Sequence, residues 1–139
     1  MSVLALDVGE RRIGVAISDP GESFAMPLEV IERSALRDDI ARIVNLAEEH
    51  RAGTIIVGDP IRLSGERGPA SEKIDRFVEQ LARAWSGAIE RVDERLTTAQ
   101  ATRTLLEADV SRKGRRNVVD KLAAALMLET YLARRRPPN

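Results

Sequence analysis

The sequence of 139 residues lacks cysteine altogether and contains a single histidine, His50. A disulfide framework and a thiolate zinc site are therefore excluded, and one imidazole cannot build a histidine metal cluster. No apolar run approaches the roughly 20 residues that a membrane-spanning helix requires. We therefore expect a soluble cytoplasmic protein with no membrane partner.

An excess of charge of one sign is also missing, because 22 lysines and arginines balance 22 aspartates and glutamates. Net charge thus gives no support for a generally basic nucleic-acid-binding protein. The cations are unevenly distributed, however, with one cluster at the arginine-rich end, residues 134–136, and another formed by Arg112, Lys113, Arg115 and Arg116. Such a cluster can attract phosphates locally, or it can simply face water.

Aromatic residues are scarce, with two phenylalanines, one tryptophan and one tyrosine. Phe77 and Trp85 lie on a stripe of apolar residues at helical spacing, which is typical of a helix face packed in a core. We therefore assign both to the core and not to the stacking of nucleic-acid bases.

Apolar runs and turn residues predict five strands, at residues 3–8, 13–18, 23–31, 54–58 and 88–93. Helical spacing predicts helices at residues 36–52, 74–85, 97–108 and 117–134, and residues 59–69 form the longest irregular stretch. The first three strands follow one another through short turns, whereas helical crossovers precede the last two. The order predicts one domain over residues 1–139, an α/β fold with a mixed five-stranded sheet. Three of its strands are antiparallel, two are parallel, and helices cover both faces.

Acidic residues stand at the predicted ends of several elements. Asp7 interrupts the apolar first strand, Asp93 and Glu94 end the fifth, and Asp120 lies near the start of the last helix. The carboxyl ends of parallel strands meet at one edge of a sheet, so these groups can converge there. Small residues on the same helix side as Asp120, Ala123 and Ala124, would allow a close approach to the sheet. Clustered carboxylates repel one another unless hard cations such as Mg²⁺ neutralise them, and two such ions hydrolyse phosphodiesters.

Each carboxylate also has a structural alternative. Asp7 could hydrogen-bond the turn at Gly9, and Asp120 could stabilise the dipole of its helix. The acidic pair at 93–94 could form a surface ion pair with Arg95. Spacing alone leaves these alternatives open.

Motifs along nearly the whole chain together resemble the YqgF (RuvX) family. They comprise residues 6–9 with 12–16 and 18–19, residues 57–58 with Pro60, Gly65 and Gly68, residues 93–98, and residues 120–124 with 131–132. Members of that family are regarded as pre-16S rRNA nucleases related to Holliday junction resolvases, with an RNase H-like fold. The resemblance implies that Asp7, Glu94 and Asp120 are catalytic residues that bind Mg²⁺, with Mn²⁺ as a substitute.

Two positions leave the ligand set open. Strand alternation allows only one of Asp93 and Glu94 to point inward. Asp59 stands where the family more often has an apolar residue, and it is either a fourth metal ligand or a solvent-facing loop residue. Arg11 and Arg12, together with the cluster at residues 112–116, are candidates for binding phosphates of nucleic acid.

The leading hypothesis is a metal-dependent nuclease that cleaves structured RNA, with 5′ maturation of pre-16S rRNA as the role that the resemblance implies. A Holliday junction resolvase acting on four-way DNA would use the same carboxylates, but it would need a homodimer. An actin-like kinase or ATPase shares the first motif, yet about 139 residues supply only one of its two domains. A non-catalytic protein that binds nucleic acid or ribosomal particles is the fourth alternative. The sequence does not distinguish a monomer from a homodimer.

Overall fold

A computed structural model describes residues 1–60, 64–94 and 113–135, with only the backbone described for residues 113–118. Five strands and three helices lie in these ranges: β1 (Ser2–Val8), β2 (Arg12–Ser18), β3 (Ala25–Glu32), α1 (Leu36–Glu49), β4 (Ala52–Asp59), α2 (Pro69–Ala84), β5 (Ala88–Asp93) and α4 (Lys113–Arg135). The helix predicted at residues 97–108 lies outside the described residues. No helix in the described ranges is long and apolar enough to cross a membrane.

The strands form one sheet in the order β3-β2-β1-β4-β5. β1 pairs antiparallel with β2, and β2 pairs antiparallel with β3, whereas β4 runs parallel to both β1 and β5. This is the predicted mixed sheet with a central first strand. Pro27, which has no N–H group to donate, lies in the edge strand β3, as expected.

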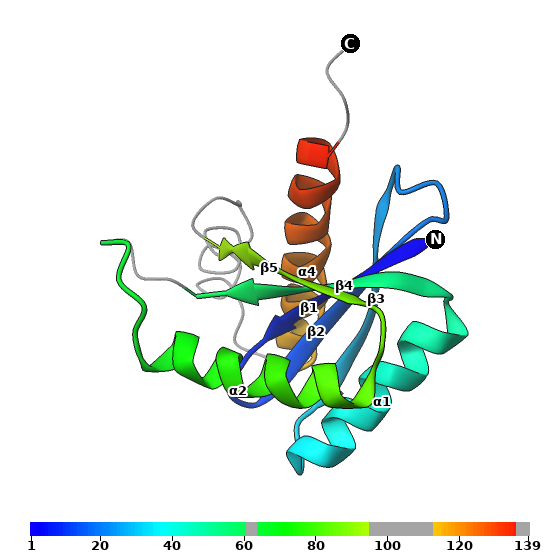
Figure 1. The fold of residues 1–139 in the computed structure, drawn as a ribbon. Coiled ribbons are helices and arrows are strands. Elements are labelled where there is room, and N and C mark those ends of the chain that lie inside the picture. The colour runs from blue at the N-terminus through cyan, green and yellow to red at the C-terminus, as the bar shows by residue number, and fades with distance from the viewer. Residues whose placement is uncertain (61–63, 95–112, 136–139) are drawn as a thin grey trace.

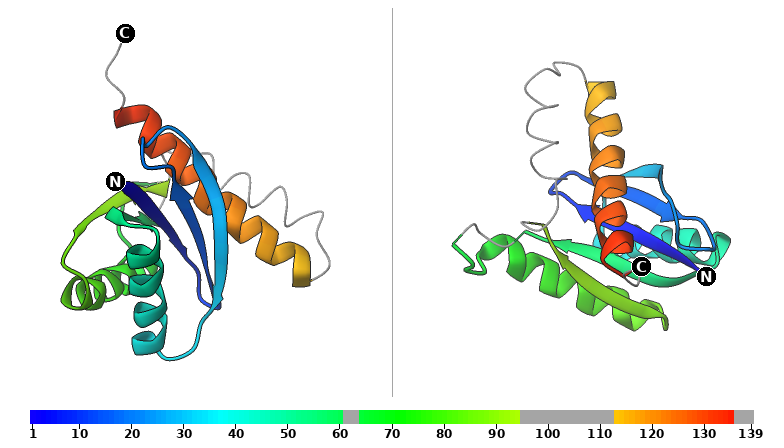
Figure 2. Two further views of the ribbon diagram at one scale, coloured as in Figure 1. Left: turned by 90° about the vertical axis from the view of Figure 1, so that its right-hand side faces the viewer. Right: turned by 90° about the horizontal axis from the view of Figure 1, so that it is seen from above.

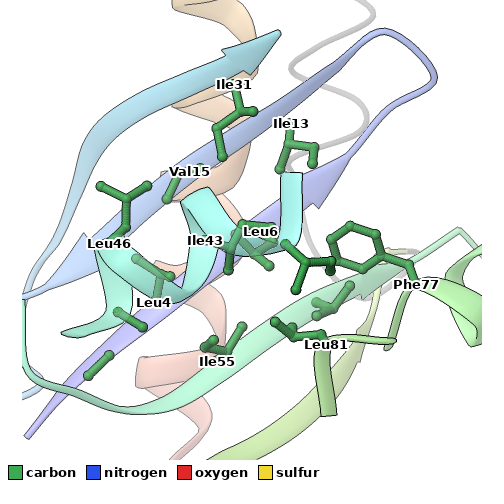
Figure 3. Packing of buried hydrophobic residues seen from close by; sticks show 14 of the residues in the cluster. Leu4, Leu6, Ile13, Val15, Ile31, Ile43, Leu46, Ile55, Phe77 and Leu81 are labelled. Carbon is green, nitrogen blue, oxygen red and sulfur yellow. The ribbon is translucent and has the colours of Figure 1, made fainter. Parts of the chain in front are cut away.

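The helices cover both faces of the sheet, α1 and α2 on one side and α4 on the other (Figure 1, Figure 2). Alternation along β1 distributes its residues between two cores. Leu4 and Leu6 join the core beneath α1 and α2, which Figure 3 shows in close view. Val3 and Ala5 join a second core beneath α4.

The core beneath α4 is built largely from small side chains. Ala5 and Ala16 of the sheet meet Ala123 and Ala124 of the helix, and all four are 2% exposed or less. Small residues on both surfaces allow the helix backbone to approach the strands closely. The expected close approach of this helix to the sheet is therefore present.

Several element boundaries differ from the predictions, among them the starts of β3, α2 and α4. β3 begins at Ala25 and not at residue 23, because the Asp19 carboxylate accepts hydrogen bonds from the backbone N–H groups of Gly21, Ser23 and Phe24 and holds them in a turn. α2 begins at Pro69, well before the first apolar position of its stripe. α4 begins at Lys113, so most of the basic cluster predicted as a connection lies within its first turns.

Candidate active site at the carboxyl edge of the sheet

Asp7 is a buried carboxylate near the end of the central strand, with 4% of its surface exposed. It follows Val3 and Ala5 in alternation, and it therefore lies on the face of the sheet that α4 covers. An ionised carboxylate in such a position costs several kcal/mol, on the order of the penalty for a buried charge, unless its surroundings compensate. The surroundings of Asp7 are thus the starting point for the site.

Glycines flank Asp7 on both neighbouring strands. Gly14 of β2 is its direct partner in the antiparallel register. On β4, Gly58 follows Val57, which pairs with Leu6 of β1. Neither neighbour places a side chain beside Asp7, and the space is filled by groups from elsewhere in the chain.

Asp120 fills the space beside Gly14. A Cβ atom on Gly14 would lie 2.2 Å from the carbonyl oxygen of Asp120, so only glycine at this position lets α4 rest against β2. The side chain of Asp120 accepts a hydrogen bond from Nε of Arg12 at 2.8 Å. Both side chains are partly buried, with 14% of Asp120 and 16% of Arg12 exposed. Arg12, predicted to contact phosphate, thus holds a carboxylate of the candidate site.

Glu94 fills the space beside Gly58. A Cβ atom on Gly58 would lie 2.5 Å from Oε1 of Glu94 and 2.9 Å from Sδ of Met127 on α4. Glu94 is 8% exposed. Burial raises the pKa of its carboxyl group, and the negative charges of Asp59 and Asp93 raise that pKa further.

The register of β5 separates Asp93 from Glu94. Asp93 pairs with Asp59 at the ends of the two strands. Two residues before Asp93, Arg91 forms an ion pair with Asp75 of α2. Alternate residues of a strand share a face, so Arg91 and Asp93 both lie on the side of the sheet that faces α2. Glu94 instead lies on the α4 side, where its Oε1 and the Sδ atom of Met127 both lie beside Gly58. Of the two adjacent acids, Glu94 is therefore the one that shares a face with Asp7 and Asp120.

Asp59 has a different environment from the one expected of a loop residue. It ends β4, is 5% exposed, and accepts a hydrogen bond from the hydroxyl of Ser71 at 2.7 Å. Its other oxygen accepts a hydrogen bond from Arg67 at 3.2 Å. The solvent-facing alternative is therefore wrong, because hydrogen bonds to Ser71 and Arg67 hold Asp59 against the start of α2.

The remaining predicted residues are placed only in part. Arg11 is exposed in the turn between β1 and β2. Arg112 lies outside the described residues, as do the side chains of Lys113, Arg115 and Arg116. Among the described side chains, no group of three or more acids and histidines stands ready to hold a metal ion. The structure thus brings Asp7, Asp120 and Glu94 to one face of one edge without closing them around a common point.

Sequence reasoning did not identify the two glycines or the ion pair as parts of the site. Gly14 interrupts an apolar run and Gly58 ends one, and a glycine in a strand was the available signal of a close approach. No local signal links Arg12 with Asp120, which are 108 positions apart.

Comparison with known proteins gives a match over nearly the whole chain. Residues 1–134 match the model of the RuvX family, which is described as Holliday junction resolvase. A relative from Thermoanaerobacter pseudethanolicus is 48% identical over 133 residues, covering 95% of this chain and 96% of its own. A second, from Symbiobacterium thermophilum, is 46% identical over 141 residues and covers 100% and 98%. Both carry the name "Putative pre-16S rRNA nuclease".

Solved structures share the fold at low sequence identity. RuvC of Thermus thermophilus, in complex with a Holliday junction substrate, superposes with a TM-score of 0.59 at 16% identity and covers 97% of each chain. The fowlpox virus resolvase, in complex with Holliday junction DNA, gives a TM-score of 0.55 at 10% identity and covers 96% of this chain and 98% of its own. These likenesses confirm the predicted RNase H-like fold.

Proposed function

The chain belongs to the RuvX family, and on that premise we propose that it is a metal-dependent nuclease that hydrolyses phosphodiester bonds in structured RNA. The name of its curated relatives supports the 5′ maturation of pre-16S rRNA as the reaction. We further propose that residues 1–139 act as one nuclease domain, in the cytoplasm, on RNA that is free or held in ribosomal particles.

The observation that carries this proposal is the shared position of three carboxylates. Asp7 and Glu94 are both more than nine-tenths buried at the carboxyl edge, on the face covered by α4. Asp120 reaches the same face because Gly14 admits the backbone of its helix. Acidic side chains are usually exposed, whereas these three lie largely buried on one side of one edge.

The donor chemistry of this set fits Mg²⁺ or Mn²⁺. All three side chains offer carboxylate oxygens, the ligands that hard divalent ions prefer. The pKa of Glu94 is raised because its carboxyl group is buried close to other negative charges. A cation bound nearby would offset this repulsion and favour the ionised carboxylate. We assign Asp7, Glu94 and Asp120 as the residues that would hold the metal. When bound there, divalent ions would activate water and stabilise the departing oxygen of a phosphodiester.

The chain's own residues then have separate roles. Asp7 lies on β1, the central strand, which pairs with a strand on each side. Arg12 fixes the carboxylate of Asp120 and neutralises part of its charge. The small residues beneath α4 keep that helix against the sheet, so Asp120 keeps its position relative to Asp7. Asp59 and Asp93, on the side of α2, lie outside the proposed ligand set.

Cleavage of a precursor rRNA fragment by purified protein tests the proposal. Asp7→Asn keeps the size of the side chain but removes its charge, and we expect it to reduce the cleavage rate by a factor of about 100 or more. Glu94→Gln should behave alike, and a chelator should abolish the wild-type activity. Asp38→Asn, which changes an exposed acid in the first turn of α1, is the matched control. Cleavage that survives both Asp7→Asn and chelation would refute the mechanism.

A second candidate function rests on the description of the family as Holliday junction resolvase. Four-way DNA has two strands to cut across a symmetric centre, so a resolvase requires two active sites in a homodimer. Parallel assays on precursor rRNA and on a four-way DNA junction, with the molecular mass measured in solution, separate the two functions. Cleavage of the junction alone by a dimer would replace the RNA proposal. Binding of either substrate without cleavage under any metal condition would indicate a non-catalytic role.

A further inference from the structure

A cavity of about 650 Å³ opens at the same edge of the sheet, on the face opposite to α4. Val8 and Gly9, which directly follow Asp7, form one side of it, and the first turns of α2 form the other. The side chain of Val8 packs against the core of α1 and α2, which fixes the face on which the cavity lies. The cavity is therefore adjacent to the candidate site along the chain but separated from it by the thickness of the sheet.

Charged residues of the cavity wall are predominantly basic. Arg33, Lys73 and Arg76 are its cations, and Glu10 is its single carboxylate. Lys73 and Glu10 approach each other to 3.9 Å, but their side chains are 64% and 89% exposed. An ion pair this exposed contributes little, so it does not commit Lys73 to Glu10. The wall thus favours an anion.

Arg33 is a preorganised cation. Its Nη1 donates a hydrogen bond to the carbonyl oxygen of Gly9 at 2.9 Å, and its Nε donates one to Asp39 at 3.4 Å. The guanidinium also lies over the ring of Phe77, 5.9 Å from the ring centre. These contacts fix the guanidinium plane and account for only two of its donors, so it can bind an anion without a large loss of rotamer freedom.

Arg76 is the least committed cation of the wall. Its neighbour Asp75 is already paired with Arg67 and Arg91 on the other side of α2. Within the described ranges no carboxylate forms an ion pair with Arg76. The positive charge at this end of α2 is therefore balanced on the side of Asp59 and Asp75 and unbalanced on the side of the cavity.

We propose that this cavity binds a nucleotide phosphate with its attached sugar, and that the ligand is a unit of the nucleic-acid strand that passes round this edge of the sheet to the candidate site at Asp7. The inference rests on the proposed nuclease function for the identity of the ligand. The volume lies within the range of pockets that hold small molecules, about 300 to 1,000 Å³, and exceeds what a bare phosphate needs. Arg33, Lys73 and Arg76 bind the phosphate, and apolar residues of the lining such as Pro69 and Ile74 contact the sugar.

Binding of a fluorescein-labelled single-stranded RNA, measured by fluorescence anisotropy in the presence of chelator, tests the cavity apart from cleavage. The double variant Lys73→Ala/Arg76→Ala should weaken binding by a factor of about 10 and reduce the salt dependence by about one phosphate contact. Arg83→Ala is the control, because it removes a cation from the same helix that lies outside the cavity and pairs with Glu79, and it should bind as the wild type does. Equal affinities of the double variant and the control would overturn the inference.

Adenosine monophosphate distinguishes a strand from a free nucleotide as the source of the phosphate. If the cavity serves the strand, the mononucleotide should displace the labelled RNA only at millimolar concentration; displacement at micromolar concentration would overturn the assignment to the strand. In the cleavage assay, the double variant should raise KM by the factor seen in binding and leave kcat unchanged. Loss of RNA affinity in the double variant of a protein that cleaves nothing would disprove the nuclease proposal but uphold the cavity. If the protein cleaves RNA and the double variant has an unchanged KM, the nuclease proposal would be supported and the cavity proposal overturned.

Discussion

The ion pair between Arg12 and Asp120 should stabilise the fold as well as position the carboxylate. The pair joins the start of β2 to α4 with an Nε to Oδ2 distance of 2.8 Å, and its two side chains are 16% and 14% exposed. Exposed ion pairs contribute about 0.2 to 1 kcal/mol, whereas removing one partner of a fully buried pair costs about 3 to 5 kcal/mol. At this intermediate burial, Arg12→Gln should lower the free energy of unfolding by about 2 kcal/mol.

A double-mutant cycle measures the interaction itself. Arg12→Gln, Asp120→Asn and the double variant should show a coupling energy of about 1 to 2 kcal/mol, because the two residues share one charge-assisted hydrogen bond. Urea denaturation followed by circular dichroism gives the free energies. For a chain of this size, Arg12→Gln should lower the melting temperature by roughly 6 °C.

The exposed pair between Arg42 and Glu29 provides the control. Two hydrogen bonds join these side chains, but they are 43% and 31% exposed. If solvent screening governs the difference, Arg42→Gln should cost less than about 1 kcal/mol despite its better hydrogen-bond geometry. Equal losses in Arg12→Gln and Arg42→Gln, or a coupling energy of zero in the cycle, would refute the reasoning from burial.

Two further predictions concern the approach of α4 and the network around Asp75. Gly14→Ala would place a Cβ atom 2.2 Å from the backbone of Asp120, so we expect a loss of about 1 to 3 kcal/mol in thermal denaturation. Gly21→Ala, whose Cβ atom would have its nearest neighbour at 3.1 Å in an exposed turn, should be nearly neutral, and equal stability of the two variants would contradict the close approach. Hydrogen bonds from Arg67 and then Arg91 lower the pKa of Asp75 from 3.8 to about 2. The ionised carboxylate therefore stabilises the fold above about pH 4, and this contribution to stability is lost as the pH falls through about 2. The difference in melting temperature between wild type and Asp75→Asn should therefore be constant from pH 7 to about pH 4 and vanish near pH 2, and a difference that persists at pH 2 would argue against this cause.

The sheet was predictable because its signals are local. Apolar runs bounded by turn residues located all five strands, and the short link after Gly9 made β1 and β2 antiparallel. The start of α2 was missed because its first turn contains no apolar stripe, although Pro69 at the first helical position was a signal of its own. The start of α4 was missed because charged residues fill its first turn, and these carry no hydrophobic periodicity.

The candidate site was predictable in its residue types but not in its pairings. Alternation required that only one of Asp93 and Glu94 point inward, yet the choice depends on the register of β5 against β4 and on Met127 from a distant helix. The two alternatives for Asp59 stayed open because nothing in the sequence around it indicates a hydrogen bond to Ser71. These are contacts between elements, and a pattern confined to one element does not contain them.

The glycines on either side of Asp7 explain why an acidic site can exist at this edge at all. A side chain at Gly14 or Gly58 would occupy the space into which Asp120 and Glu94 project. With glycine at both positions, three carboxylates gather on one face, while large apolar side chains pack beneath α1 and α2 on the opposite face. If this division holds, filling either glycine position should disturb the carboxylates before it disturbs the larger core. Gly58→Ala should therefore lower metal affinity, measured by calorimetry, more than a Leu46→Ala substitution that costs more stability.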